Sequence, residues 1–135
     1  MKDRVFFDTN ILIYLYSEDE LVKRNVILKL IPEYQIIIST QVINELSHVF
    51  NRKFNISWAE IKKIKEEVIS LFNLKIIDIN TINEAYKIAE VYGYSYFDSL
   101  MLSSAIENDC KIIYSEDLHH SQMIENCLYI KNPFK

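Results

Sequence analysis

Four acidic residues have the types and the surroundings to do chemistry. Asp8 ends a run of apolar, β-favouring residues, and Asp117 follows a second such run. Glu45 lies in the middle of an expected helix, and Asp98 lies in the first turn of another. Carboxylates held within a few ångströms of one another repel unless a cation neutralises them, and Mg²⁺ and Mn²⁺ prefer such hard oxygen ligands. The chemistry that follows from such a site is metal-assisted hydrolysis of a phosphodiester.

Each of these acids also has an ordinary structural explanation. Asp8 is a preferred residue type for the N-cap of the helix that follows it. Ser95 and Asp98 have the spacing of a capping box, with Asp in place of the more common Glu. Glu45 lies roughly a right angle away from the centre of the apolar stripe of its helix, so it faces either a cleft or solvent. The arrangement of the elements must decide between these alternatives.

Strands and helices are expected to alternate along the whole chain. The apolar patterns predict strands at 5–7, 35–39, 74–78, 111–115 and 128–130. They predict helices from residue 11 and over 18–32, 40–50, 57–72, 81–92 and 94–106. This alternation predicts an α/β fold with a mostly parallel sheet and right-handed crossovers. Asp8 and Asp117 then lie at the same edge of the sheet, and the helix that carries Asp98 leads into the fourth strand.

The composition limits the class of protein. The chain has 135 residues, half of them hydrophobic, which predicts one domain over residues 1–135. Its N-terminal residues resemble neither a signal peptide nor a membrane span, so we expect a soluble, cytoplasmic protein. Cys110 and Cys127 form neither a disulfide framework nor a zinc site. The net charge of −4 argues against nucleic-acid binding through a global basic field, but it allows carboxylates gathered around a divalent cation.

Four blocks along the chain form a recognisable pattern: Phe7-Asp8-Thr9-Asn10, Glu45, Tyr96-Phe97-Asp98-Ser99-Leu100 and Tyr114-Ser115-Glu116-Asp117-Leu118. In these blocks the chain resembles the PIN (PilT N-terminal) domain family, and within it the VapC-type toxin ribonucleases of bacterial toxin–antitoxin pairs. The closing Ile130-Lys131-Asn132-Pro133-Phe134 is also similar to many members. The departures are mild and remove no acidic residue: Phe97 stands where Trp is frequent, Ser99 where Ala is, and Ser115 where Thr is common.

The resemblance implies a single-domain α/β/α sandwich with a five-stranded sheet in the order 3-2-1-4-5. It also implies an endoribonuclease that depends on Mg²⁺ or Mn²⁺, a homodimer, and an antitoxin partner whose segment fills the acidic groove. The residues carried over as catalytic and metal-binding are Asp8, Glu45, Asp98 and Asp117. The residues expected to orient carboxylates and water are Thr9, Asn10 and Ser115.

Some positions stay open at this point. Glu116 stands beside Asp117, and the alternation of side chains along a strand directs only one of the two inward. The pattern of the family favours Asp117. His48, one turn after Glu45, and the pair His119 and His120 have no assigned role, and neutral loop histidines are the simpler interpretation of the pair.

Two other classes of function fit part of the sequence. A haloacid-dehalogenase-like phosphatase would use Asp8 as a nucleophile, with Ser39 or Thr40 and the pair Glu116-Asp117 in support. Against it, Asn10 stands where that class carries a second acid, and the chain is short for that fold. A non-catalytic PIN-like binding scaffold would tolerate the loss of its acids, yet all of them are present. Sequence alone does not separate a toxin from an RNA-processing enzyme.

Overall fold

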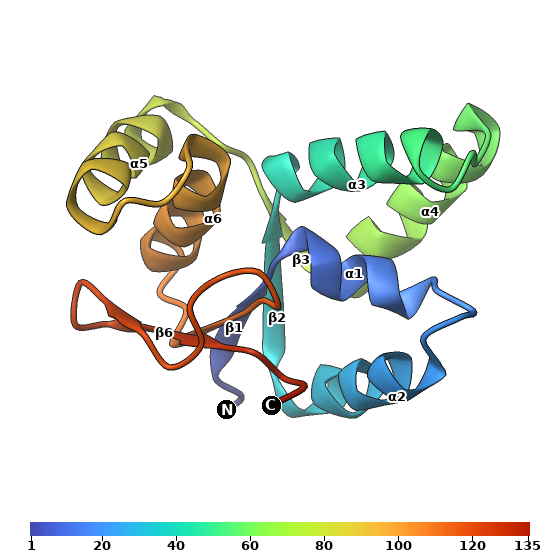
Figure 1. Cartoon of the computed structure of the whole chain (residues 1–135), viewed down its shortest axis with the longest axis horizontal. Coiled ribbons are helices and arrows are strands. Elements are labelled where there is room, and N and C mark those ends of the chain that lie inside the picture. Colours follow the sequence, from blue (N-terminus) through green and yellow to red (C-terminus); the bar gives the residue numbers. More distant parts are fainter.

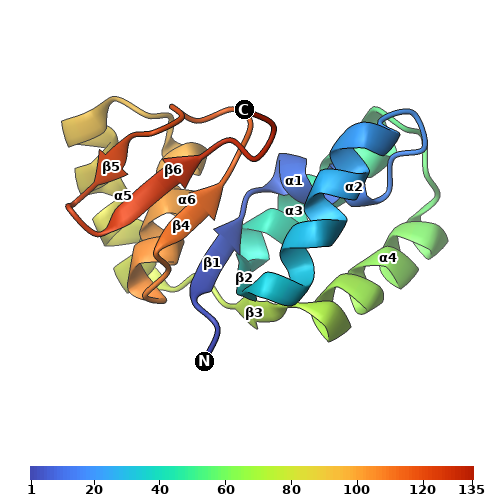
Figure 2. The ribbon, with the colours of Figure 1, turned by 90° about the horizontal axis from the view of Figure 1, so that it is seen from below.

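A computed structural model describes residues 1–135 as a mixed sheet with helices on both sides. Figures 1 and 2 show α1 to α4 on one side of the central strands and α5 and α6 on the other. The strands follow the order β3-β2-β1-β4-β6-β5, and all neighbours are parallel except β5 and β6. Their bounds are β1 Arg4–Phe7, β2 Gln35–Ser39, β3 Asn73–Lys75, β4 Ile112–Tyr114, β5 Met123–Ile124 and β6 Leu128–Lys131.

The helices fill the connections between the parallel strands. They are α1 Thr9–Leu15, α2 Leu21–Leu30, a 3₁₀ turn Ile31–Glu33, α3 Thr40–Arg52, α4 Trp58–Leu71, α5 Ile79–Tyr92 and α6 Tyr96–Glu107. Helices α3 and α4 form a hairpin that projects from the sheet (Figure 1). Ser57 caps α4 by accepting a hydrogen bond from the Glu60 amide at 3.2 Å.

The register of the two central strands places the end of β1 beside the end of β4. Phe7 pairs with Tyr114, and the Asp8 amide donates to the Tyr114 carbonyl at 3.0 Å. The side chains of Val5, Phe6 and Phe7 are fully buried, so this register is fixed by the core. Asp8 and Ser115 are therefore neighbours at the carboxyl edge of the sheet, where ligands bind in open α/β folds.

The expected order of the five strands is confirmed, and a sixth strand extends it. The two-residue strand β5 pairs with β6 through a tight turn in which Glu125 and Asn126 have positive φ angles of 51° and 57°. Two successive left-handed residues are typical of a two-residue hairpin. Because neither of these two residues is a glycine, the sequence gives little indication of a turn here, and the short strand β5 was not predicted.

Several predicted boundaries were wrong. The third strand ends at Lys75 instead of residue 78, because Asp78 caps α5 and accepts a hydrogen bond from the Thr81 amide at 3.1 Å. Helix α5 therefore starts at Ile79, two residues before its expected start. Helix α2 starts only at Leu21, and Glu20 caps it without a side-chain hydrogen bond.

Helix α6 is buried on nearly all sides, as its sequence predicts. Its residues Ser99 to Ala105 are all buried, and the Ser103 hydroxyl donates to the Thr81 carbonyl of α5 at 2.7 Å. Asp98 is half-buried at the start of this helix. The tight packing of α6 against α5 and the sheet thus fixes the position of Asp98.

No helix is both long and apolar enough to cross a membrane. Both cysteines are free thiols, Cys110 in the core and Cys127 at the surface.

Gly93 ends α5 in the left-handed conformation, with φ of 77°. A Cβ atom at this position would meet nothing within 4 Å, so a Gly93→Ala variant adds backbone strain without a clash. We expect a loss of about 1 kcal/mol in the free energy of unfolding, measured by urea denaturation. Asn55→Gly, at φ of 56°, is the matched control and should not destabilise the protein. Equal stability of Gly93→Ala and the wild type would contradict this account of the helix end.

Candidate active site

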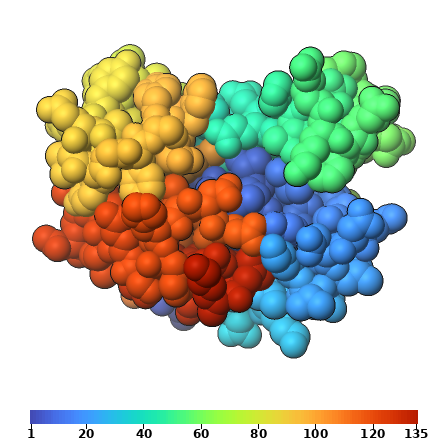
Figure 3. Space-filling model, in the orientation of Figure 1, coloured from blue at the N-terminus to red at the C-terminus, as the bar shows by residue number.

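One open cavity collects all four of the predicted acids. It has a volume of about 470 Å³, and Asp8, Glu45, Asp98 and Asp117 belong to its lining. In Figure 3 the surface is hollowed between α5–α6 and α3–α4, with the N-terminal segment at the floor. The other lining residues are Thr9, Asn10, Ile13, Gln41, Asn44, His48, Val49 and Phe97. The fold therefore brings together residues that lie up to 109 positions apart in the sequence.

Asp8 is both a helix cap and the most buried acid of the cavity. One carboxylate oxygen accepts a hydrogen bond from the Thr9 amide at 2.8 Å, and the other accepts one from the Ser115 hydroxyl at 2.7 Å. The pKa of Asp8 is raised to about 7, mainly by burial and also by the charges of Glu45 and Asp98, although its two hydrogen bonds lower it. The helix-cap explanation is thus correct but incomplete, because this carboxyl group also lies in an acidic field.

Glu45 projects from α3 into the same cavity and is held at both oxygens. Thr9 donates its hydroxyl hydrogen to Oε1 at 3.0 Å, and Gln41 donates from its amide to Oε2 at 3.1 Å. Two such bonds fix a half-buried side chain that would otherwise be mobile. Glu45 is therefore oriented toward Asp8 through Thr9.

Ser115 and Asn10 hold the loop after β4. The Ser115 hydroxyl oxygen accepts hydrogen bonds from the amides of Asp117 at 3.2 Å and Leu118 at 3.4 Å while it donates to Asp8. Asn10 donates from its side chain to Asp117 at 2.9 Å and accepts from the Glu116 amide at 3.2 Å. Thr9, Asn10 and Ser115 thus contact the carboxylates that they were expected to orient, and that role stays a prediction.

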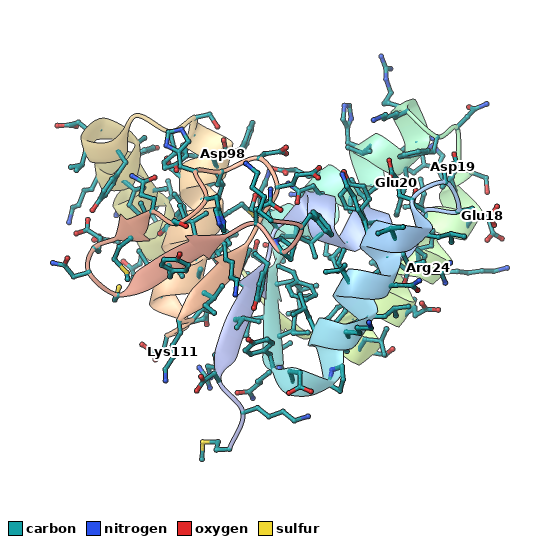
Figure 4. The ribbon with its side chains drawn as sticks, turned by 60° about the horizontal axis from the view of Figure 1, so that its bottom comes forward. Glu18, Asp19, Glu20, Arg24, Asp98 and Lys111 are labelled. Carbon is teal, nitrogen blue, oxygen red and sulfur yellow. The ribbon has the colours of Figure 1, made fainter.

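Asp98 reaches the cavity from the opposite face of the sheet. Ser95 caps α6 by accepting a hydrogen bond from the Asp98 amide at 3.2 Å. Burial raises the pKa of the Asp98 carboxyl, the Ser95 hydroxyl opposes this change, and the charge of Asp117 adds to it. Figure 4 shows Asp98 well away from the acidic run of Glu18, Asp19 and Glu20 at the start of α2. That run does not line this cavity.

Glu116 faces away from the acidic cavity. Its carboxylate accepts a hydrogen bond from the Tyr14 hydroxyl and forms an ion pair with Lys23, each at 2.5 Å. Burial raises the pKa of Glu116, but its bonds to Lys23 and Tyr14 outweigh this effect and leave the pKa below its usual range. Of the adjacent acids, only Asp117 lines the cavity that holds Asp8.

A polar face of α3 also lines the cavity, and the sequence analysis missed most of it. Gln41, Asn44, Glu45 and His48 are spaced as one helical face, and each lines the cavity. This spacing was visible in the sequence as a polar stripe beside the apolar one. The His119 ring instead contacts Tyr94, with the ring centres 5.4 Å apart, and His120 Nδ1 accepts a hydrogen bond from the Asn132 amide at 3.0 Å.

The donor atoms of the cavity suit a hard cation. All four acids supply carboxylate oxygens, and no cysteine lines the cavity. No three His, Cys, Asp or Glu side chains form a group that could hold a metal ion in the present conformation. Burial is the largest cause of the raised pKa values of Asp8 and Asp98, and repulsion from neighbouring carboxylates adds to it. A divalent cation among them would remove that repulsion.

Comparisons with known proteins identify the family. The PIN domain model matches residues 5–125, so the chain belongs to the PIN domain family. No curated protein sequence gives a significant match.

Solved toxin structures share the fold. VapC20 of Mycobacterium tuberculosis, described as a toxin that cleaves the sarcin-ricin loop, is 13% identical with a TM-score of 0.70, over 84% of this chain and 89% of that one. A toxin–antitoxin complex from Klebsiella pneumoniae is 20% identical with a TM-score of 0.72, over 96% and 97% of the two chains. VapBC2 of Rickettsia felis, bound to a DNA fragment from its promoter, is 17% identical with a TM-score of 0.69, over 96% and 99%.

The buried charge of Asp8 should cost stability when no cation is present. Asn at this position keeps an acceptor for the Thr9 amide and removes the repulsion from Glu45 and Asp98. We expect Asp8→Asn to raise the free energy of unfolding by about 1 to 2 kcal/mol in EDTA at pH 8, measured by urea denaturation. The exposed Asp3→Asn is the control and should change little. Lower stability of Asp8→Asn would show that the hydrogen bonds of this carboxylate outweigh its repulsion.

Proposed function

We propose that this PIN-domain protein is a metal-dependent endoribonuclease that hydrolyses RNA phosphodiesters, and that it is the toxin of a type II toxin–antitoxin pair. The observation that carries the proposal is the convergence of Asp8, Glu45, Asp98 and Asp117 on one open cavity at the carboxyl edge of the sheet. Acids gathered in this way, with two pKa values raised, are typical of a catalytic site.

The four acids would hold the cation, and their neighbours would set their orientation. Mg²⁺ or Mn²⁺, when bound, would activate a water molecule and stabilise the leaving oxygen of the phosphodiester. Ser115 and the Thr9 amide keep both oxygens of Asp8 in place, and Thr9 and Gln41 do the same for Glu45. Asn10 positions Asp117. These bonds keep the carboxylates of Asp8, Glu45 and Asp117 at the cavity, and the acids would have to draw closer together to share one cation.

The partners proposed for the chain are an RNA substrate, a cognate antitoxin protein and a second copy in a homodimer, all in the cytoplasm. Structures of similar fold are described as toxin–antitoxin complexes, which supports the antitoxin partner. The cavity is acidic and open, so a basic antitoxin segment would complement its charge.

The phosphatase hypothesis gains no support from the site. That class needs a second acid two residues after the nucleophile, and here Asn10 stands at this position and donates a hydrogen bond to Asp117. The PIN family match also favours the nuclease. A non-catalytic scaffold is the alternative that an activity assay tests.

Purified wild-type protein should cleave a mixed single-stranded RNA with Mg²⁺ or Mn²⁺, and EDTA should stop the reaction. Asp8→Asn and Asp98→Asn should each lower the rate by at least about a hundredfold, because each removes a negative ligand. The measurement is the cleavage rate on labelled RNA, with circular dichroism as the check on folding. Full activity of both folded variants would mean that these acids are only helix caps.

Glu116 and Asp117 can be separated by a matched pair of substitutions. Asp117→Asn should lower the cleavage rate strongly, because Asp117 lines the cavity with Asp8. Glu116→Gln should retain most of the activity, because its carboxylate is directed to Lys23 and Tyr14. The reverse order of effects in the same RNA assay would contradict this assignment.

A further inference from the structure

A compact network of hydrogen bonds surrounds Glu116, which is adjacent to Asp117 but does not line the acidic cavity. Lys23 donates to Glu116 Oε2 at 2.5 Å and to the Tyr14 hydroxyl at 3.2 Å, and Tyr14 donates to Glu116 Oε1 at 2.5 Å. The three side chains come from α2, α1 and the loop after β4, and they close a triangle of hydrogen bonds. We call this triangle the Lys23 latch.

The C-terminal segment completes the latch. The Phe134 ring packs edge-on against the Tyr14 ring, with the ring centres 5.4 Å apart. The Lys23 ammonium lies 4.7 Å from the Tyr14 ring centre and 5.2 Å from that of Phe134. Two aromatic faces near one ammonium add cation–π attraction to the ion pair. Lys23 is therefore held by more than the isolated surface pairs of this protein, such as Lys63 with Glu60 at 3.4 Å.

The latch acts on a carboxylate that lies beside the acidic cavity. Glu116 and Asp117 both line a second cavity of about 420 Å³, which shares Asn10, Ile13, Val49 and Asp117 with the first. Asn10 holds both acids in place, because its side chain accepts a hydrogen bond from the Glu116 amide and donates one to the Asp117 carboxylate. A Glu116 side chain released from Lys23 and Tyr14 would thus add a negative charge beside the first cavity, whose lining already contains four carboxylates.

We propose that Lys23 and Tyr14 are positioning residues that withdraw the Glu116 carboxylate from the acidic site, so that Asp117 alone faces the cation from this loop. The effect of this withdrawal on RNA cleavage rests on the proposed function. Withdrawal matters because the number of charged ligands sets how tightly a cation is held, and excess negative charge repels the phosphates of a substrate.

The test compares divalent-cation binding and RNA cleavage in an unlatched variant. Tyr14→Phe with Lys23→Met removes the three bonds of the triangle and keeps the ring and the aliphatic stem. We expect Mn²⁺ to bind about fivefold more tightly by titration calorimetry, and KM for RNA to rise by a similar factor. Adding Glu116→Gln to this variant should return both values to those of the wild type.

Two controls separate positioning from general stability. Lys23→Arg keeps the ion pair and should bind Mn²⁺ like the wild type. Lys63→Met changes the net charge as Lys23→Met does, but its pair with Glu60 is highly exposed, so it should leave both values unchanged. A loss of packing alone would lower the melting temperature without a change in Mn²⁺ affinity that Glu116→Gln reverses.

The outcomes distinguish this inference from the proposed function. Unchanged Mn²⁺ affinity in the unlatched variant, or a change that persists after Glu116→Gln, overturns the latch even if the wild type cleaves RNA. A reversible change in Mn²⁺ affinity without RNA cleavage supports the latch and overturns the nuclease. If the wild type binds no Mn²⁺, a crystal structure of the unlatched variant decides: Glu116 turned toward Asp117 supports the latch, and Glu116 still beside residue 14 overturns it.

Discussion

The burial of a carboxylate beside other carboxylates is the constraint on which this site depends. Asp8 is only 5% exposed, and burial together with the charges of Glu45 and Asp98 raises its pKa to about 7. A fold selected for stability alone would not place a buried acid among other acids. The surrounding hydrogen bonds hold these acids in place but do not neutralise them. The arrangement is explained if a cation completes the site.

Elements on both faces of the sheet position the four acids. The register of β1 with β4 brings Asp8 next to Ser115, and Ser115 orders the loop that presents Asp117. Helix α3 delivers Glu45 from one face, and α6 delivers Asp98 from the other. Each acid thus depends on a different element, so the site forms only when the whole sheet and its helices have assembled.

The sequence was informative wherever a local pattern determined the structure. The apolar run before Asp8 predicted β1, the β-branched run predicted β2 with its observed bounds, and the small and apolar residues after Asp98 predicted a buried helix. The strand order predicted that Asp8 and Asp117 meet at one edge of the sheet, and the resemblance to the family added Glu45 and Asp98 to the same site. The family match confirms the resemblance from which that order was taken.

The remaining features depend on contacts that local patterns do not carry. The hairpin at Glu125 and Asn126 needs two strained residues without glycine, and the end of β3 depends on Asp78 acting as a cap. The partner of Glu116 is Lys23, 93 positions away, and no periodicity predicts such a pair. The cavity-facing role of Gln41 and Asn44 became evident only once α3 was placed against α1.

The most direct test of the central claim is anomalous diffraction from crystals of the wild-type chain grown with Mn²⁺. The account predicts an anomalous peak inside the cavity, within about 2.0 to 2.5 Å of carboxylate oxygens from Asp8 and at least one of Asp98 and Asp117. A well-ordered structure with all four acids in place and no peak among them, at a Mn²⁺ concentration that supports RNA cleavage, would contradict it.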